Sequence, residues 1–210
     1  MSLTSAIEPK VKQDLLPVVE TFHSVQGEGF WSGSSAFFIR LAGCDVGCSW
    51  CDTKHSWPMD RHPMQAVSAL VESAIAARPF MVVITGGEPL MHNLNELTRA
   101  LKRAGLRVHV ETSGSHPLTG EFDWISLSPK RFKPPLEEIY PQASELKVIV
   151  DNRLDLVWAE QAARKVSAET IKLLQPQWES ANAVDLVMDY VLSHSEWRVG
   201  LQTHKFLGVR

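Results

Sequence analysis

The chain has 210 residues, of which 44% are hydrophobic, and its formal net charge is -3. This length suffices for one sizeable core and is short for two ordinary domains, so we expect a single domain. The charge lacks the basic excess that nucleic-acid binding needs, so no nucleic-acid partner is expected. No apolar stretch approaches the roughly 18 residues of a membrane span, so no membrane is expected either.

The first predicted elements lie before residue 58. Residues 1–17 are polar and end at Pro17, so we expect a flexible N-terminal arm, with one domain spanning residues 18–210. The apolar run Val18–Val25 opens this domain, and Ala36–Leu41 has the composition of a buried strand. A loop that carries glycines and cysteines follows over residues 43–57.

The rest of the chain alternates between helical and strand-like patterns. Helical periodicity covers residues 64–77, 94–104, 155–165 and 181–193, and strand-like runs cover 80–84, 108–111, 124–127, 146–150, 171–174 and 197–202. The proline-rich segment between residues 129 and 144 leaves no room for one covering helix. We therefore predict an α/β fold, an abbreviated partial TIM-like barrel of about six mostly parallel strands with fewer covering helices.

All the cysteines of the chain lie in one short loop. Cys44, Cys48 and Cys51 have Cys-x3-Cys-x2-Cys spacing, and the N-terminus lacks a signal peptide, so we expect reduced thiols in the cytoplasm and metal chemistry before disulfides. Three thiolates can hold three irons of a 4Fe-4S cluster and leave the fourth iron open. The alternative is structural zinc completed by His55, but zinc ligands usually come in two pairs on separate elements, which favours the cluster.

Polar groups follow several of the predicted strands. Thr85-Gly86-Gly87-Glu88-Pro89 comes after the run 80–84, where the glycines allow close backbone approach and Glu88 offers an acceptor for an ammonium group. Similar short polar segments follow at residues 111–114 and 126–130. Loop polarity alone also explains such segments, so each is a weak signal by itself.

Three further features point to a small polar ligand. Gln26-Gly27-Glu28-Gly29 places an amide and a carboxylate on a narrow loop, and this pair suits a guanine-like edge, although a hairpin turn has the same composition. Arg40 lies within a buried strand, where its guanidinium suits a carboxylate of a ligand or a buried ion pair. His204 is either a core histidine or a ligand contact, whereas the others, including His109, are predicted to be surface or packing positions.

The cysteine spacing, with an aromatic residue before the third cysteine and the later glycine-rich turn, resembles the signature of radical S-adenosylmethionine (SAM) enzymes. Together with QGEG, ETSG, SPK and the closing QTHK, these motifs are similar to the 7-carboxy-7-deazaguanine synthase family from about Val18 to the C-terminus. The resemblance implies a partial barrel of the radical SAM type that binds a 4Fe-4S cluster, SAM and Mg2+.

The resemblance also implies an activity. Members of this family are carbon-nitrogen lyases that convert 6-carboxy-5,6,7,8-tetrahydropterin to 7-carboxy-7-deazaguanine with loss of ammonia, in the biosynthesis of queuosine and 7-cyano-7-deazaguanine. The cluster takes an electron from an external donor such as flavodoxin or ferredoxin, and the family suggests a cytoplasmic homodimer. The tRNA itself need not be touched.

The family pattern assigns roles to particular positions. Thr53 corresponds to a hydroxyl that binds Mg2+, and the adjacent Asp52 is expected to point the other way because successive residues of an extended segment face opposite sides. SAM contacts are assigned to Trp50, Gly87, Glu88, Thr112, Ser113, Ser128, Pro129 and Lys130. Substrate contacts are assigned to Val25, Gln26, Gly27, Glu28, Arg40, Thr85, His204 and Arg210, the last through its terminal carboxylate.

Two other functions stay open at this stage. A glycyl-radical activating enzyme shares the cysteine spacing and the Gly-Gly-Glu-Pro turn but acts on a protein partner, and the QGEG and QTHK segments argue against it. A zinc-stabilised binding module without catalysis is the other.

Overall fold

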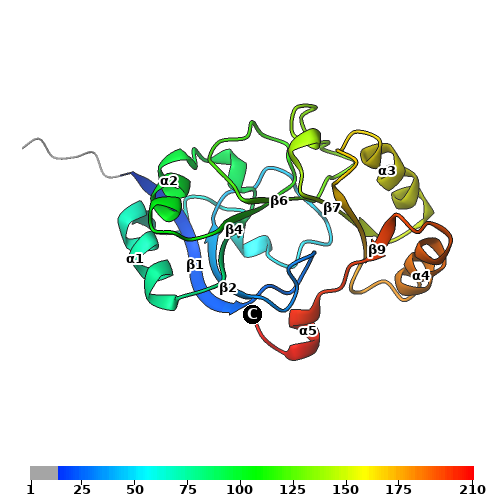
Figure 1. Cartoon of the computed structure of the whole chain (residues 1–210), viewed down its shortest axis with the longest axis horizontal. Helices are drawn as coiled ribbons and strands as arrows, with labels where there is room; N and C mark the ends of the chain where they lie inside the picture. The colour runs from blue at the N-terminus through cyan, green and yellow to red at the C-terminus, as the bar shows by residue number, and fades with distance from the viewer. Residues whose placement is uncertain (1–13) are drawn as a thin grey trace, which may run out of the picture.

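Residues 14–210, which the computed structural model describes, are organised around one nine-stranded sheet with the order β3-β1-β2-β4-β5-β6-β7-β8-β9. The sheet curves into an open partial barrel (Figure 1). All neighbours from β2 onward are parallel, whereas β1 is antiparallel to both β2 and β3. The strands are β1 Leu15–Val25, β2 Ser35–Leu41, β3 Met64–Ala66, β4 Met81–Gly86, β5 Val108–Thr112, β6 Trp124–Leu127, β7 Glu145–Val150, β8 Ile171–Pro176 and β9 Trp197–Val199.

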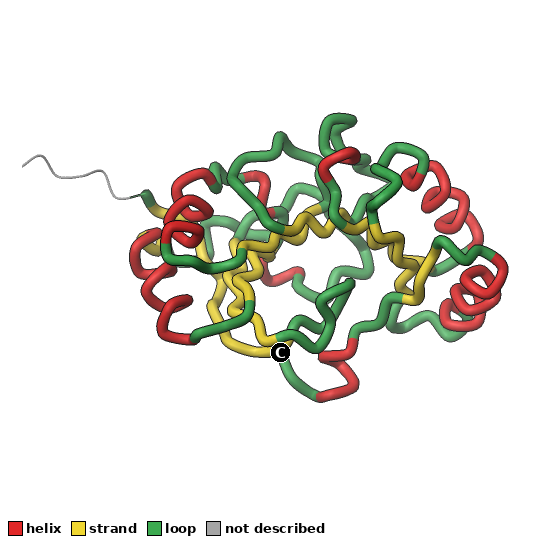
Figure 2. The backbone as a smooth tube through the Cα atoms, in the orientation of Figure 1, coloured by secondary structure: helices red, strands yellow, loops and turns green. Residues whose placement is uncertain are grey.

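The helices lie along the outer side of the curved sheet, apart from short segments at its open side (Figure 2). They are α1 Val67–Ala77, α2 Asn95–Arg103, α3 Arg153–Ala163, α4 Ala183–Ser193 and the short α5 Thr203–Leu207. In residues 14–210, β5 connects to β6 without an α-helix, and the segment between β6 and β7 holds only the 3-10 turn Tyr140–Gln142. None of the helices in this part of the chain has the length and apolar character needed to cross a membrane.

Side chains alternate along each strand, which gives the sheet two different faces. Phe37, Ile39 and Leu41 of β2 point outward into the main core, where they join apolar residues of the covering helices. Ala36 and Phe38 point inward with Met81 and Val83 and form a small second cluster. Arg40, Thr85, Glu111 and Lys147 have the same inward parity, so polar groups line the interior above this cluster.

The structure differs from the sequence prediction at the edges of the sheet. Residues 1–13 of the predicted arm lie outside the described residues, whereas Leu15–Pro17 pair with Met64–Ala66 as strands β1 and β3. Met64–Ala66 is therefore not the start of a helix, because this pairing outweighs its helical pattern. The sheet has more than the expected six or so strands. The three-residue β3 was not predicted as a strand, whereas β9 lies within the predicted run 197–202 and ends earlier, at Val199.

Candidate active site

One cavity of about 220 Å³ lies where the parallel strands end, and all three cysteines line it. We call it the cysteine cavity. Seven of the eight positions predicted to bind SAM also line it, namely Trp50, Gly87, Glu88, Thr112, Ser113, Ser128 and Lys130. Pro129 instead lines a smaller neighbouring cavity that shares Trp50 and Lys130 with the first.

A second cavity of about 670 Å³ adjoins the first, and we call it the arginine cavity because Arg40 and Arg210 line it. Every position predicted to contact the substrate lines this cavity: Val25, Gln26, Gly27, Glu28, Arg40, Thr85, His204 and Arg210. The two cavities share Glu28, Asp52, Thr53, Thr85, Gly86 and Glu111, which therefore form the wall between them.

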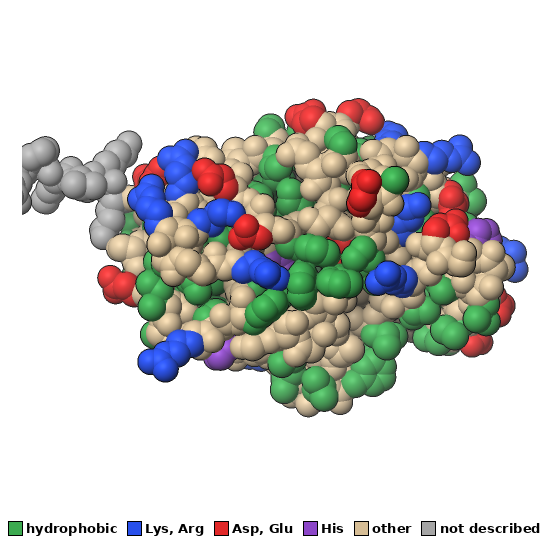
Figure 3. Space-filling view, in the orientation of Figure 1, with side chains coloured by type: hydrophobic (Ala, Val, Ile, Leu, Met, Phe, Trp, Pro, Cys, Tyr) green, Lys and Arg blue, Asp and Glu red, His purple; other side chains and the backbone are tan. Residues whose placement is uncertain are grey.

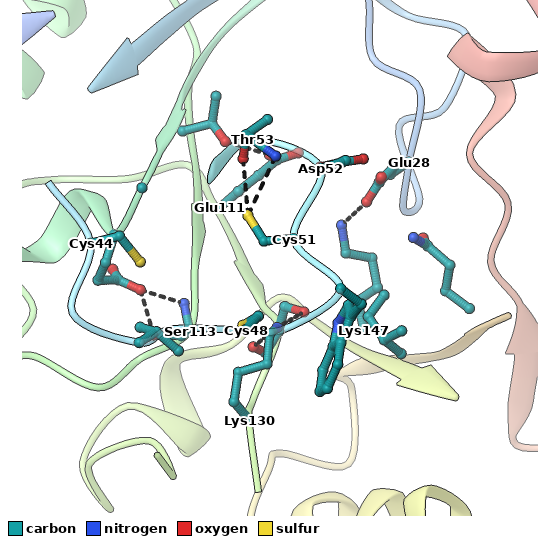
Figure 4. Close-up of a pocket in the computed structure, with 18 of the residues that line it drawn as sticks. Glu28, Cys44, Cys48, Cys51, Asp52, Thr53, Glu111, Ser113, Lys130 and Lys147 are labelled. Carbon is teal, nitrogen blue, oxygen red and sulfur yellow. Dashed lines mark hydrogen bonds and ion pairs between the residues drawn. The ribbon is translucent and has the colours of Figure 1, made fainter. Parts of the chain in front are cut away.

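The three thiols face the same space from one loop (Figure 4). Burial raises the pKa of the Cys44 thiol, and burial also raises that of Cys48, although the nearby Lys130 ammonium opposes it. The thiol of Cys51 lies 3.4 Å from the Thr53 hydroxyl. The raised pKa values favour the protonated thiols in the metal-free protein, so a cluster bound here would have to displace these protons.

The glycine-rich turn after β4 packs directly on the cysteine loop. Glu88 N donates to the Gly43 carbonyl at 2.8 Å, and Gly87 N donates to the Leu41 carbonyl at 3.0 Å. A Cβ at Gly87 would collide with the Gly43 carbonyl and lie 2.8 Å from the Cβ of Cys44. Only glycine fits at this position, and this close packing fixes the first cysteine relative to the turn.

The geometry does not suit a single zinc ion. In residues 14–210, no three His, Cys, Asp or Glu side chains lie close enough together to bind one metal ion. His55, the proposed fourth ligand, lines the arginine cavity, not the cysteine cavity. The three thiols line one cavity, where they could hold three irons of a cluster.

Glu88 does not present a free carboxylate. It is 1% exposed, and its two oxygens accept hydrogen bonds from the hydroxyl of Thr112 at 2.6 Å, from Leu90 N at 3.0 Å and from the amide and hydroxyl of Ser113. The carboxylate therefore ties the loop after β4 to the loop after β5. The predicted role of Glu88 as an acceptor for an ammonium group would require one of these four donors to leave.

Lys130 and Ser128 are joined by hydrogen bonds in the cysteine cavity. The Lys130 ammonium donates to the Ser128 carbonyl at 2.6 Å and to its hydroxyl at 2.7 Å, and burial lowers the pKa of this lysine. Trp50 is 42% exposed and contacts Phe132 edge to face. It is therefore not a core tryptophan.

Glu28 of the shared wall and Lys147, which lines the cysteine cavity, form a largely buried ion pair (Figure 4). Burial tends to raise the pKa of Glu28, but Lys147 and a 2.6 Å hydrogen bond from Gln202 lower it to about 2. Gln26 is 2% exposed and donates to Glu111 at 2.9 Å, while its side-chain oxygen accepts from Glu28 N at 3.1 Å. The amide of Gln26 thus positions its neighbours and has little surface left for a ligand.

The arginine cavity holds two guanidinium groups and one shared carboxylate. Arg40 Nε lies 3.0 Å from one oxygen of Glu20, and Arg210 lies 2.9 Å from the other. Both guanidiniums also lie over the ring of Phe22. Arg40 is therefore in an ion pair and lines a cavity at the same time, and these three groups sum to one excess positive charge.

The structure corrects the prediction for the residue before Thr53. Cys51 to Lys54 form a turn leading into the 3-10 helix Lys54–Ser56, not an extended segment, so strand alternation does not apply. Asp52 and Thr53 consequently both line the wall between the cavities. Asp52 also pairs with Lys205 at 3.1 Å.

Several residues that line the cysteine cavity were not predicted as site residues. Glu111 accepts hydrogen bonds from Gln26 and from the Thr85 hydroxyl, at 2.9 and 2.8 Å. Lys147 has the same sequence signal as Arg40, a charge within a buried strand, and could have been found by it. Gln202 and Lys205 belong to the QTHK segment, but their spacing gives no indication of their partners.

His109 lies inside the barrel below these groups, 1% exposed, and neither ring nitrogen has a partner among residues 14–210. Burial and the nearby Lys147, opposed by Glu111, lower its pKa from 6.5 to about 4. The unfolded chain therefore binds more protons between these pH values, and folding stability should fall by roughly 3 kcal/mol as the pH falls from 6.5 to 4.

We expect His109→Phe to flatten this part of the stability profile, because the variant has no imidazole to protonate on unfolding. Urea unfolding across the acid range measures the effect, and His23→Phe, which replaces an exposed histidine of β1, serves as the control. An unchanged acid slope in His109→Phe would mean that other groups cause the acid sensitivity.

Comparison with known proteins places the chain among characterised relatives. The radical SAM superfamily model matches residues 38–167. A 7-carboxy-7-deazaguanine synthase from Synechocystis is 58% identical, over 92% of this chain and 93% of the relative, and one from Flavobacterium psychrophilum is 46% identical over 99% of both. The crystal structure of QueE from Escherichia coli superposes with a TM-score of 0.81 at 31% identity, over 90% of this chain and 95% of that one.

Proposed function

Because the chain belongs to the 7-carboxy-7-deazaguanine synthases of the radical SAM superfamily, we propose that its two adjoining cavities divide the reaction between them. The family binds a 4Fe-4S cluster and SAM and acts as a carbon-nitrogen lyase in the queuosine pathway. In our proposal the cysteine cavity holds the cluster and SAM, and the arginine cavity holds the pterin substrate. The observation that carries this division is the wall of six residues that both cavities share.

The residues of the cysteine cavity would bind and orient the cofactors. Cys44, Cys48 and Cys51 would hold three irons of the cluster, and the turn at Gly86 and Gly87 would place backbone groups against SAM. When bound, the cluster and SAM supply reductive cleavage of SAM and a radical that removes hydrogen. Trp50, Thr112, Ser113, Ser128, Pro129 and Lys130 would line the SAM site.

The residues of the arginine cavity would orient the substrate. The guanidinium groups of Arg40 and Arg210 suit the carboxylate of the pterin. On the other side, Glu28 retains acceptor capacity beyond Lys147 and Gln202 and can receive hydrogen bonds from an amino-pyrimidine edge. Contacts of different polarity at its two ends would favour one orientation of the substrate in the cavity.

Anaerobic turnover tests this assignment. The protein reconstituted with iron and sulfide should convert 6-carboxy-5,6,7,8-tetrahydropterin to 7-carboxy-7-deazaguanine and ammonia in equal amounts when SAM and a reductant are present. Mass spectrometry and an ammonia assay measure both products. A colourless protein that carries one zinc and forms neither product would refute it.

We propose that Mg2+ binds at Thr53, in the shared wall. Its hydroxyl lines both cavities, and Mg2+ commonly uses one or two protein ligands together with waters and substrate oxygens. Asp52, in the same turn, is held by Lys205 at 3.1 Å. Thr53 is thus the neutral oxygen ligand available beside the substrate carboxylate.

We expect Thr53→Ala to lower the rate and blunt the response to added Mg2+, whereas Thr53→Ser should retain much of both, because the hydroxyl is the ligand. Product formation across a Mg2+ titration gives the first measurement. The EPR signal of Mn2+ in the protein with SAM and substrate gives a second, independent of turnover. A full metal response in Thr53→Ala would place the ion elsewhere.

Three partner and location assignments complete the proposal. We propose that the electron comes from an external donor such as flavodoxin or ferredoxin, since all three cysteines of the chain belong to the cluster loop. We place the enzyme in the cytoplasm, where thiols stay reduced. We propose a homodimer, supported by apolar side chains that gather in the middle of one face (Figure 3) and by exposed aromatic residues such as Phe30 and Phe80; sedimentation velocity tests it.

A further inference from the structure

Lys205 of α5 joins three segments that are distant in the sequence. Its ammonium lies 3.1 Å from Asp52 of the cysteine loop, donates to Gln202 at 2.9 Å and lies 5.0 Å from the centre of the Trp178 ring. The lysine side chain is 21% exposed, and it lines the cysteine cavity. Apart from its ion pair with Asp52, this group has no role in the site described above.

The contacts continue from Lys205 into the arginine cavity. Gln202, whose oxygen accepts from Lys205, donates from its nitrogen to Glu28 at 2.6 Å. Thr203 N donates to the Gly27 carbonyl at 2.8 Å. A chain of polar contacts therefore runs from Asp52, beside the proposed Mg2+ ligand, to Glu28, beside the proposed substrate edge.

We propose that Lys205 is a positioning residue that sets the separation between the Asp52-Thr53 turn and the loop carrying Glu28. An exposed ion pair alone would do little, since Asp52 is 58% exposed and such pairs are weak. Lys205, however, contacts a carboxylate, an amide and an indole ring from three segments, so its loss frees all three at once. Packing of Phe206 against Trp178, at 5.2 Å between ring centres, keeps α5 over this position.

This inference rests on the proposed use of the arginine cavity for the pterin. Although Lys205 lines the cysteine cavity, its contacts lead to Glu28 and to the Asp52-Thr53 turn, so its loss should affect the substrate more than the cofactors. Cluster binding depends on the thiols, and the SAM positions Glu88, Ser113 and Lys130 are fixed by contacts that do not include α5.

The test compares Lys205→Met with Lys165→Met, the same substitution at an exposed pair with Glu137. We expect Lys205→Met to raise the KM for the pterin roughly ten- to a hundredfold, the usual range for one charge-assisted contact network. The KM for SAM, the cluster absorption and SAM cleavage without substrate should stay within about twofold of wild type. Lys165→Met should match wild type throughout.

Two further measurements separate positioning from general stability. Hydrogen exchange should increase at residues 203–207 and 52–53 in Lys205→Met while the core strands keep their protection. Lys205→Arg should recover most of the pterin KM, since a guanidinium can reach the same carboxylate and ring. An unchanged pterin KM in Lys205→Met, or an equal rise in the KM for SAM, would overturn the inference. Failure of the wild-type protein to use the pterin would instead refute the proposed function.

Discussion

Cys48→Ala is expected to abolish the cluster and all SAM cleavage. The three thiols of the chain lie on one loop and line one cavity, and no other cysteine can replace the missing ligand. Two thiolates cannot hold a cubane with one defined open iron, so the loss should be complete and not partial. Iron and sulfide content, visible absorption and formation of 5'-deoxyadenosine measure it after anaerobic reconstitution.

Ser49→Ala provides the matched control for this variant. Ser49 is an exposed neighbour in the same loop and offers no thiol, so its variant should keep the cluster and activity. The fold should survive in Cys48→Ala, because the main core lies between the sheet and the outer helices, away from this loop. Retention of a full cluster and of SAM cleavage in Cys48→Ala would contradict the assignment of the three thiols.

The sequence predicted the site best where function depends on short local segments. The three cysteines, the turn at Gly86-Gly87 and the predicted substrate positions line the two cavities. The cysteine loop follows β2 and the glycine turn ends β4, and parallel strands bring their carboxyl ends together. The strand parity that places Arg40 on the inner face also places Lys147 there. Lys147 has the same sequence signal as Arg40, a charged side chain within a buried strand.

What the sequence could not predict are the pairings between distant residues. Glu28 and Lys147 lie 119 positions apart, and Gln202 and Glu28 lie 174 apart, so only the closure of the sheet and the placement of α5 bring them together. Pairing likewise overrode the local pattern at Met64–Ala66, where a helical periodicity became a strand beside Leu15–Pro17. The bonds of Glu88 to Thr112 and Ser113 also depend on two neighbouring loops, and this changes its expected role.

Lys147→Met is expected to destabilise the protein by about 3 to 5 kcal/mol near neutral pH, the usual cost of leaving one partner of a buried pair uncompensated. The lysine side chain is 7% exposed, and burial alone would lower its pKa, but Glu28 and Glu111 raise it well above 10.5. Its removal leaves the Glu28 carboxylate buried with only Gln202 as a donor nearby. For a domain of this size, the melting temperature should fall by roughly 6 to 20 °C.

The pH dependence of stability shows whether loss of the Glu28–Lys147 pair causes the destabilisation of Lys147→Met. The lowered pKa of Glu28 means that its stabilisation is complete above its ordinary value of 4.5 and is lost as the pH falls toward 2. The raised pKa of Lys147 means that its stabilisation is complete below 10.5 and is lost only above that value. The difference in unfolding free energy between wild type and Lys147→Met should therefore be largest near neutral pH. It should narrow as the medium becomes acidic.

Denaturant unfolding of five proteins, namely wild type, Lys147→Met, Lys165→Met, Glu28→Gln and the double variant, decides whether this account holds. Lys165→Met, which breaks the exposed pair with Glu137, should cost less than about 1 kcal/mol. The double variant Glu28→Gln/Lys147→Met should recover part of the loss, because a neutral amide in place of the carboxylate no longer needs a cation. Lys147→Met could prove as stable as Lys165→Met, or the double variant could be less stable than the sum of the two single-variant losses in unfolding free energy predicts. Either result would mean that the Glu28–Lys147 pair does not hold the wall between the cavities. The wall would then depend on the hydrogen bonds that Gln26 and Thr85 donate to Glu111.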